Sequence, residues 1–457
     1  MSRTHPCALM LLLVLALLAQ PARAALEVQN WTTPGGTRVL FVESRALPIV
    51  DVSIEFPAGS SRDEPAVSRL ANLTLQMLRL GSRARGEPHA PTADPALTED
   101  EVALRLADVG AQLSSTFDVD RAGYSLRTLS SARERAQALD VLAAVVQRPA
   151  FPPEVVAREK ERVIAGLREA AVKPNVVAQR AFAQLVFGEH PYALRLTGEL
   201  ESVAALQPEQ LAQFHRTHYL RDRAVISIIG DLDRSEAERI AHALSDGLPL
   251  GESEAGDPPP SVASLAEPVQ RYIAHDAAQA HVIVGAPGMR RSDPDYFPLL
   301  VGNYILGGGG FNSRLTVQVR ERRGLTYSVY SAFYPYLREG AFAISLQTRK
   351  DQADEALNVV RDTLARFVSE GPTEAELDGA RQHLVGAFPL RIDSNRKLLD
   401  YLAVIGYYGL PMDWLDRFPE RVSEVTLAQI RDAFRRRVDP ARMATVVVGG
   451  TPPSAQP

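Results

Sequence analysis

One short stretch, residues 66–82, has the spacing of a helical metal site without the side chains for one. It reads AVSRLANLTLQMLRLGS, and Asn72, Leu75 and Gln76 stand at positions i, i+3 and i+4. This spacing places the three side chains on one face of a helix. A hydrolytic zinc site on such a face would need two imidazole or carboxylate ligands and a carboxylate base. Here the face offers two amides and an apolar side chain, so it cannot supply that chemistry by itself.

Other candidate groups are sparse. The chain has neither a GxSxG elbow nor a GxxxxGK[ST] loop, and the run GGGGF at 307–311 lacks the spacing of a phosphate cradle. A flexible loop or a close approach of the backbone explains four glycines better. His215 and His218 stand at i and i+3 before a strand-like segment, but no acidic residue completes a site there. A structural or surface role is favoured for this pair over a metal site.

The N-terminus predicts export. Residues 1–24 combine a short positive head, the apolar run CALMLLLVLALLAQ and the small-residue sequence Ala22-Arg23-Ala24. This is the pattern of a signal peptide, and an uncleaved anchor is the alternative. Cys7 is the only cysteine and lies inside this segment, so the mature chain has no disulfide and no thiolate metal site. Without a lipid-attachment cysteine at the cleavage point, we expect a periplasmic location.

Composition narrows the class of protein. The chain has 457 residues, 46 % hydrophobic and 23 % charged, with a formal net charge of -5. No basic patch is interleaved with aromatic residues, which argues against a nucleic-acid partner. No apolar run after the N-terminal segment reaches the length of a membrane span. The chain is therefore expected to be globular, with its stability supplied by core packing.

Two halves of the chain resemble each other. The segment 251–268, GESEAGDPPPSVASLAEP, is predicted to be a linker between a first domain, 25–250, and a second, 269–452. Pro152 to Gly166 and Pro372 to Gly386 span equal intervals at an offset of 220. Each half opens on strand-like alternation, at 50–59 and 281–289, and closes on a helix followed by a β-branched strand. Duplication explains this order better than chance similarity.

The predicted fold class is α+β. Each half would be an α/β sandwich, an antiparallel-rich sheet with helices on it, and the two halves would form a clam-shell. The segment 83–101 in the first half is polar and rich in proline, so it is expected to be a loop.

These residues resemble the pitrilysin/insulinase-type zinc peptidases, which include the subunits of mitochondrial processing peptidase and the core subunits of the respiratory bc1 complex. The similar stretches are GGTRVL at 35–40, GSSRDEP at 59–65, REKE at 158–161 and GGGFNSRLTVQVRERRGLTYSVYS at 308–331. The last is the most specific. The resemblance covers roughly residues 26–450.

The resemblance places the family's zinc motif on the stretch described first. Aligned without a gap, Asn72 and Gln76 take the two histidine positions and Leu75 that of the glutamate base, while Gly166 takes the third ligand's place. All four depart from the pattern. The resemblance therefore implies that this chain holds no zinc and hydrolyses nothing alone. The two amides are expected to be buried and hydrogen-bonded to each other or to a neighbouring backbone group.

The motif in the second half, at 308–331, matches the family's pattern. Arg320 and Tyr327 match the arginine and tyrosine that the family brings to the zinc site, where an arginine can hold a carbonyl or carboxylate and a tyrosine can donate to an oxyanion. The alternative is that Arg320 caps a helix and Tyr327 is a half-buried strand residue. The resemblance implies a non-catalytic, substrate-binding subunit of a metalloendopeptidase complex. Its partner would be a homologous catalytic subunit that carries His-x-x-Glu-His and zinc, and its substrate a peptide lying along a sheet edge.

Two other functions stay open at this stage. One is a binding or scaffold protein that has kept the fold and has no role in proteolysis. A self-sufficient enzyme with an unrecognised site is the third. Retention of Arg320 and Tyr327 favours the subunit over the scaffold.

Overall fold

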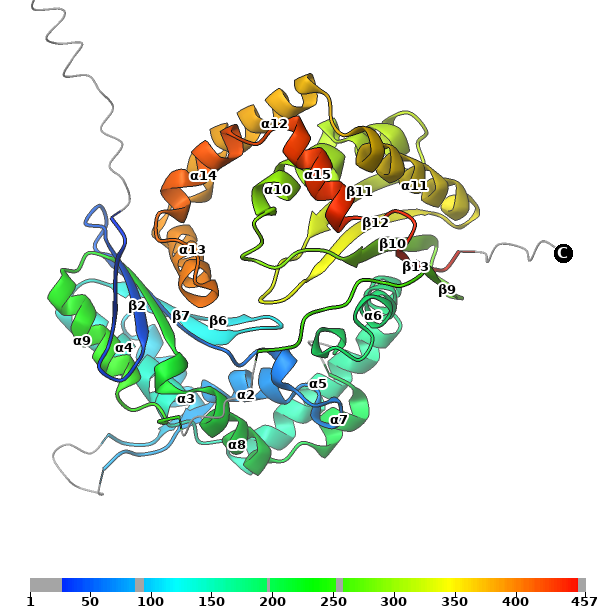
Figure 1. The fold of residues 1–457 in the computed structure, drawn as a ribbon. Coiled ribbons are helices and arrows are strands. Elements are labelled where there is room, and N and C mark those ends of the chain that lie inside the picture. The colour runs from blue at the N-terminus through cyan, green and yellow to red at the C-terminus, as the bar shows by residue number, and fades with distance from the viewer. Residues whose placement is uncertain (1–26, 87–93, 195–197, 252–257, 451–457) are drawn as a thin grey trace, which may run out of the picture.

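The computed structural model describes residues 27–86, 94–194, 198–251 and 258–450, which form two mixed β-sheets with helices packed on them (Figure 1). The α+β class is therefore confirmed. The predicted signal peptide, 1–24, and part of the predicted linker, 252–257, lie outside the described residues. Within the described ranges, no helix is both long and apolar enough to cross a bilayer.

The first sheet has six strands. In spatial order they are β1 (Gln29–Thr32), β2 (Arg38–Glu43), β8 (Val225–Gly230), β3 (Ile49–Phe56), β7 (Ala122–Leu129) and β6 (Gln112–Phe117). Only β2 and β8 run parallel; the other neighbours are antiparallel. A two-stranded ribbon, β4 (Gly81–Ser82) with β5 (Leu97–Thr98), lies apart from it.

The second sheet repeats this arrangement. Its order is β9 (Val269–Ile273), β13 (Ala444–Val448), β10 (Gln279–Pro287), β12 (Ala341–Arg349) and β11 (Thr326–Phe333). β9 and β13 are its parallel pair, as β2 and β8 are in the first sheet. Strands β2-β8-β3-β7-β6 and β9-β13-β10-β12-β11 thus correspond one to one, as a duplication predicts. β6 and β11 form equivalent sheet edges.

Helices cover both sheets. In the first half they are α2 (Leu70–Leu78), α3 (Glu99–Ala107), α4 (Ala132–Gln147), α5 (Pro153–Ala171), α6 (Pro174–Phe187), α7 (Leu200–Ala205), α8 (Pro208–His218) and α9 (Arg234–Ser245). In the second they are α10 (Tyr296–Asn303), α11 (Ala353–Glu370), α12 (Glu374–Gly386), α13 (Asn395–Tyr408), α14 (Trp414–Ser423) and α15 (Leu427–Arg437). Local signals set several starts: α12 and α15 begin with capping boxes, and α5 and α6 begin with proline.

The two halves exchange equivalent helices. α6 of the first half packs on β10 and β13, burying Phe182 among residues of the second sheet such as Ile283 and Val446. α13 of the second half packs on β8 and β3 of the first sheet. This second layer explains why β3 is buried almost throughout rather than on alternate residues only. Each sheet therefore needs the other half to cover one of its faces.

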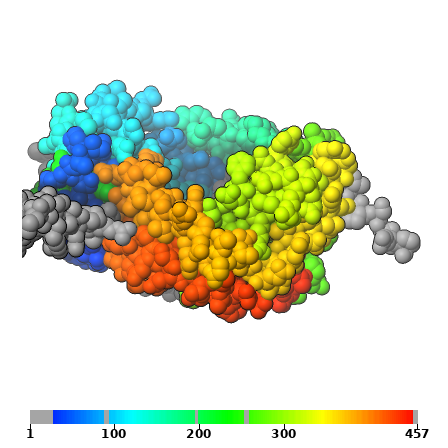
Figure 2. All heavy atoms as spheres, turned by 90° about the horizontal axis from the view of Figure 1, so that it is seen from above, coloured from blue at the N-terminus to red at the C-terminus, as the bar shows by residue number. Residues whose placement is uncertain are grey.

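A polar joint fixes the halves to each other. Asp120, in the turn between β6 and β7, accepts a hydrogen bond from the Tyr408 hydroxyl at 3.0 Å and from the Leu337 backbone N–H at 2.6 Å. Its other carboxylate oxygen accepts from the Tyr192 hydroxyl at 2.7 Å. Burial raises the pKa of Asp120, while the bonds from Tyr192 and Leu337 oppose that rise. Figure 2 shows the surface hollowed between an orange and a yellow-green segment, with blue atoms at the floor.

Candidate functional site

Helix α2 carries the degenerate zinc-motif positions, and Asp63 fixes where it starts. One Asp63 carboxylate oxygen accepts from the Arg69 backbone N–H and the other from that of Ala71, both at 2.8 Å. These two N–H groups belong to the first turn, where a helix has no partners of its own. Burial raises the pKa of Asp63 to about 7, against the effect of the two backbone bonds.

Leu75 is part of the core. Its side chain is 1 % exposed, and its carbonyl accepts from the Tyr124 hydroxyl at 2.6 Å. The position that resembles the family's base thus points into the hydrophobic core.

The expected pairing of the two amides is wrong. Asn72 and Gln76 are partly buried, and in the described part of the chain Asn72 Oδ1 and Gln76 Oε1 are buried without any hydrogen-bond donor. The backbone N–H groups in the interior of a helix bond within the helix, so those of α2 are not free to reach these two oxygens. The two carbonyl oxygens are therefore unsatisfied acceptors on α2.

Gly166 lies on the exposed side of α5. A Cβ built at this position meets no atom within 4 Å. The buried side of the same helix is formed by Val156, Glu159, Val163 and Leu167. Glu159 accepts from Arg162 Nε at 2.8 Å and so has a cation of its own.

The zinc that the family implies does not fit these residues. Amide oxygens bring no charge, leucine offers no lone pair and glycine has no side chain. Among the described residues, no three His, Cys, Asp or Glu side chains come together in a way that could hold a metal ion. The donor set at positions 72, 75, 76 and 166 is thus unsuited to zinc.

The two histidines of HRTH hold structure together. His215 is buried, with Nε2 2.7 Å from the Val146 carbonyl, and its ring stacks on Tyr219 at 5.0 Å. Burial lowers the pKa of His215 to about 4, and burial lowers that of His218 to about 4 as well. The sequence favoured a structural or surface role for this pair over a metal site.

Arg320 and Tyr327 border one surface pocket. Arg320 lies on the π-helical turn η7 (Thr316–Glu321), and Tyr327 on β11. Together with Phe311 they line a pocket of ≈ 320 Å³. The Arg320 Cζ lies 4.8 Å from the centroid of the Phe311 ring, at cation–π distance. Tyr327 is 85 % exposed, so the alternative of a half-buried strand residue is wrong.

Glycines shape this pocket. A Cβ on Gly307 would lie 2.4 Å from the Ser331 hydroxyl oxygen and 2.6 Å from its backbone nitrogen, so only glycine fits between the loop and β11. Gly310 has φ +60, in the left-handed region that favours glycine. Both lie within the GGGGF run, for which the sequence predicted a flexible loop or a close backbone approach; the contact of Gly307 with β11 is the second of these.

Tyr327 also borders a second pocket. That pocket, of ≈ 310 Å³, lies between β11 and α6 of the other half. No residue of α2 lines either pocket. The α2 positions and the Arg320–Tyr327 pair therefore belong to separate surfaces of the described chain.

Exposed aromatic residues extend this surface. Phe311 is 65 % exposed, and Tyr330 and Tyr334 are exposed further along β11 and its turn. No sequence signal singled out Tyr330 and Tyr334, because strand alternation alone does not tell which face of a strand is covered. The aromatic residue directly after four glycines, Phe311, is a signal that could have been used.

Comparison with known protein families covers both halves. Residues 38–199 match the model of insulinase, peptidase family M16, and residues 205–384 match that of the peptidase M16 inactive domain. The crystal structure of a peptidase M16 inactive domain from Pseudomonas fluorescens is 36 % identical, with a TM-score of 0.87. The match covers 94 % of this chain and 99 % of the chain in that structure.

More distant relatives differ in their described activity. A protein of Helicobacter pylori named as a non-peptidase homolog, YmxG, is 25 % identical over 406 residues, or 88 % of this chain and 89 % of that protein. An uncharacterized zinc protease of Mycobacterium leprae is 26 % identical over 429 residues, which are 94 % of this chain and 93 % of that protein. A chain of complex III from Candida albicans shares the fold, with a TM-score of 0.73 and 16 % identity. The match covers 92 % of this chain and 95 % of that one. This chain therefore belongs to the M16 peptidase family, that of insulinase and pitrilysin.

Proposed function

We propose that this protein is a non-catalytic, substrate-binding subunit of an exported heteromeric zinc metallopeptidase. In this proposal, a homologous partner with a His-x-x-Glu-His motif holds the zinc. This chain supplies Arg320 and Tyr327 to the partner's site. The two subunits face each other as a clam-shell around the peptide, in the periplasm.

One observation carries the proposal: the four zinc-motif positions hold no ligand, while Arg320 and Tyr327 stand together at an open pocket. Among the described residues, the Tyr327 hydroxyl has no hydrogen-bond partner and Arg320 forms no ion pair. A phenol 85 % exposed on an edge strand contributes little to its own fold. Both groups are therefore free to act on a ligand or on another chain.

The chemistry of the pair suits peptide cleavage by a metal bound elsewhere. The Arg320 guanidinium can hold a substrate carbonyl or carboxylate. The Tyr327 hydroxyl can donate a hydrogen bond to the oxyanion that develops on the attacked carbonyl. Neither group can generate the nucleophile, so the zinc and its water must come from the partner.

The edge strands suit an extended substrate. β6 and β11 each end a sheet, and an unpaired edge offers backbone donors and acceptors to an added peptide strand. The exposed aromatic residues Tyr327 and Tyr330 beside β11 can contact alternate side chains of such a peptide. An unfolded peptide is therefore the proposed substrate class.

The test is co-purification from the native host. The tagged chain is recovered, its companions are identified by mass spectrometry, and cleavage of a peptide library is assayed with and without a zinc chelator. We expect a chain with His-x-x-Glu-His in the eluate and chelator-sensitive cleavage that is lost in an Arg320→Ala, Tyr327→Phe variant that still assembles. Recovery of the chain alone, or unchanged cleavage by the variant complex, would instead support the scaffold function.

A further inference from the structure

The second half contains a pocket rich in arginine and aromatic residues, away from the site described above. It lies where α10, α13 and α14 meet, has a volume of ≈ 150 Å³ and is bordered by Arg291, Tyr296, Arg391, Tyr401 and Trp414. Two of its lining residues are cationic and none is acidic. A pocket with excess positive charge and an apolar wall is suited to an anion with an apolar body.

The two arginines lack anionic partners. In the part of the chain that the structure describes, neither Arg291 nor Arg391 forms an ion pair with a carboxylate. The Arg291 Nε is buried and has no hydrogen-bond acceptor there. A buried guanidinium N–H without an acceptor is costly, and a bound carboxylate would satisfy it.

A phenol lines the pocket beside these charges. Tyr296 lines the pocket together with Arg291 and Arg391. Burial raises the pKa of Tyr296, and the charges of the two guanidiniums act to lower it. Two guanidiniums and a hydroxyl on the wall of one pocket offer several hydrogen-bond donors to one oxyanion group. Asp293 and Asp413 border an adjoining pocket of ≈ 230 Å³, which shares Arg291, Tyr296 and Trp414 with this one.

The wall of the pocket is aromatic. The ring centroids of Tyr401 and Trp414 lie 5.9 Å apart, and those of Tyr296 and Trp414 lie 6.1 Å apart. Phe418 closes the inner end at 5.4 Å from Trp414. These rings are tilted or edge-on to one another and give an apolar wall that suits another aromatic or branched side chain.

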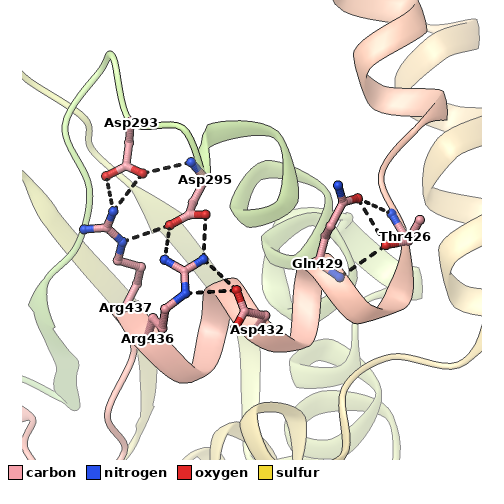
Figure 3. A network of polar contacts seen from close by, with 7 residues as sticks. All are labelled: Asp293, Asp295, Thr426, Gln429, Asp432, Arg436 and Arg437. Atoms are coloured by element: carbon pink, nitrogen blue, oxygen red, sulfur yellow. Dashed lines mark hydrogen bonds and ion pairs between the residues drawn. The ribbon is translucent and has the colours of Figure 1, made fainter.

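The loop that carries Arg291 is rigidly held. Figure 3 shows Asp293 and Asp295 facing Arg436 and Arg437 of α15, with Arg436 bonded to both oxygens of Asp295 at 2.7 and 2.8 Å. The Arg291 backbone N–H also donates to the Tyr336 carbonyl at 2.7 Å. The arginine is thus positioned by its backbone before any ligand arrives, which lowers the entropy cost of binding.

We propose that this pocket binds a carboxylate attached to an aromatic or large apolar group, with Arg291, Arg391 and Tyr296 on the carboxylate and Trp414 against the apolar group. The C-terminus of a peptide that ends in such a residue and a free aromatic acid share this chemistry. The proposal does not depend on the proposed function, because it uses none of the residues assigned there.

Trp414 makes the test direct. The chain has two tryptophans, and the other, Trp31, lies under Arg234 in the first half, so a Trp31→Phe variant reports from the pocket alone. Its fluorescence is titrated with 3-phenylpropionate, with the neutral 3-phenylpropanamide, and with acetyl-Ala-Ala-Phe as the free acid and as the amide. Arg391→Gln, which changes an exposed residue, is the variant that leaves the fold intact, and Arg290→Gln is the matched control outside the pocket.

We expect saturable changes with the acids only, about tenfold weaker binding after Arg391→Gln or Arg291→Gln, and no change after Arg290→Gln. Tighter binding of the peptide acid than of 3-phenylpropionate would identify a peptide C-terminus as the ligand. The reverse order would identify a free acid. Equal responses to acid and amide, or equal binding by Arg391→Gln and Arg290→Gln, would overturn the proposal.

Discussion

The guanidinium of Arg320 lies over the ring of Phe311, with Cζ 4.8 Å from the ring centroid. Both side chains belong to the same pocket as Tyr327, and Phe311 is 65 % exposed. The aromatic ring therefore keeps a long, flexible cation at the mouth of the pocket rather than in the solvent. This relation connects the GGGGF loop to the candidate function of Arg320.

Phe311→Ala is expected to weaken peptide cleavage by the complex about twofold to fivefold. The reason is the loss of a cation–π contact of about 0.5–1 kcal/mol at an exposed site. The rate is measured on the complex recovered from the host, with Phe311→Tyr as the control that keeps an aromatic ring. A Phe311→Ala complex as active as wild type, beside an impaired Arg320→Gln complex, would show that the ring does not position the arginine.

Leu75→Glu is expected to lower the free energy of unfolding by about 3 kcal/mol or more. The side chain is fully buried among apolar core residues, where an added carboxylate would lose its hydration. Restoring the family's base at this position therefore disrupts the core rather than creating a site. Chemical denaturation measures the effect.

Gly166→Ala, at another zinc-motif position, is expected to stabilise the protein rather than destabilise it. The position lies inside α5, and its Cβ would meet nothing within 4 Å, so the substitution should raise the free energy of unfolding by about 0.5–1 kcal/mol. A loss of stability would mean that another group occupies this surface.

Acid should destabilise the protein through His215. Its folded pKa is lowered to about 4 from an ordinary value of 6.5, so between these values the unfolded chain binds more protons than the folded one. The stability that neutral His215 contributes is present above pH 6.5 and is lost as pH falls toward 4. On the order of 2 kcal/mol should be lost by pH 5.

His215→Gln keeps a donor for the Val146 carbonyl and removes the titration. Unfolding free energies of the two proteins are compared at pH 7 and pH 5. The variant should lose less stability over this range than the wild type. Equal losses would assign the acid sensitivity to other groups.

Phe182→Ala should cost about 3–5 kcal/mol of unfolding free energy, although its helix belongs to the first half. The ring is buried on the second sheet, where a Cβ on Gly285 would come within 2.8 Å of it. Gln179→Ala, on the exposed side of α6, is the matched control and should change stability by less than about 0.5 kcal/mol. A small effect of Phe182→Ala would mean that the halves are stable without the exchanged helix.

Much of the fold could be predicted from local pattern. The strands at 50–59 and 281–289 and the offset of 220 between the halves follow from alternation and repetition, and both appear as equivalent elements, β3 with β10 and α5 with α12. The burial of both faces of β3 could not be predicted. It depends on α13, a helix more than 300 residues later in the chain, and no local pattern encodes that contact.

The same limit applies to the sites. The positions of Asn72, Leu75 and Gln76 on one helix follow from their spacing, but the absence of a donor for the two amide oxygens depends on what packs around α2. The pocket around Arg291 and Arg391 joins segments 100 residues apart. The pocket is positively charged because two arginines line it and no carboxylate does. Which carboxylates lie near these arginines depends on the three-dimensional fold, so the order of residues in the sequence could not show it.

The most direct test of the account is the kcat for peptide cleavage by the native complex that contains Tyr327→Phe. The matched control is Tyr272→Phe, on β9 at the other edge of the same sheet. If Tyr327 donates to the oxyanion at the partner's zinc site, its loss should lower kcat by about 10²–10³ while Tyr272→Phe leaves it unchanged. Equal kcat values for the two variant complexes would contradict a role of this chain in catalysis.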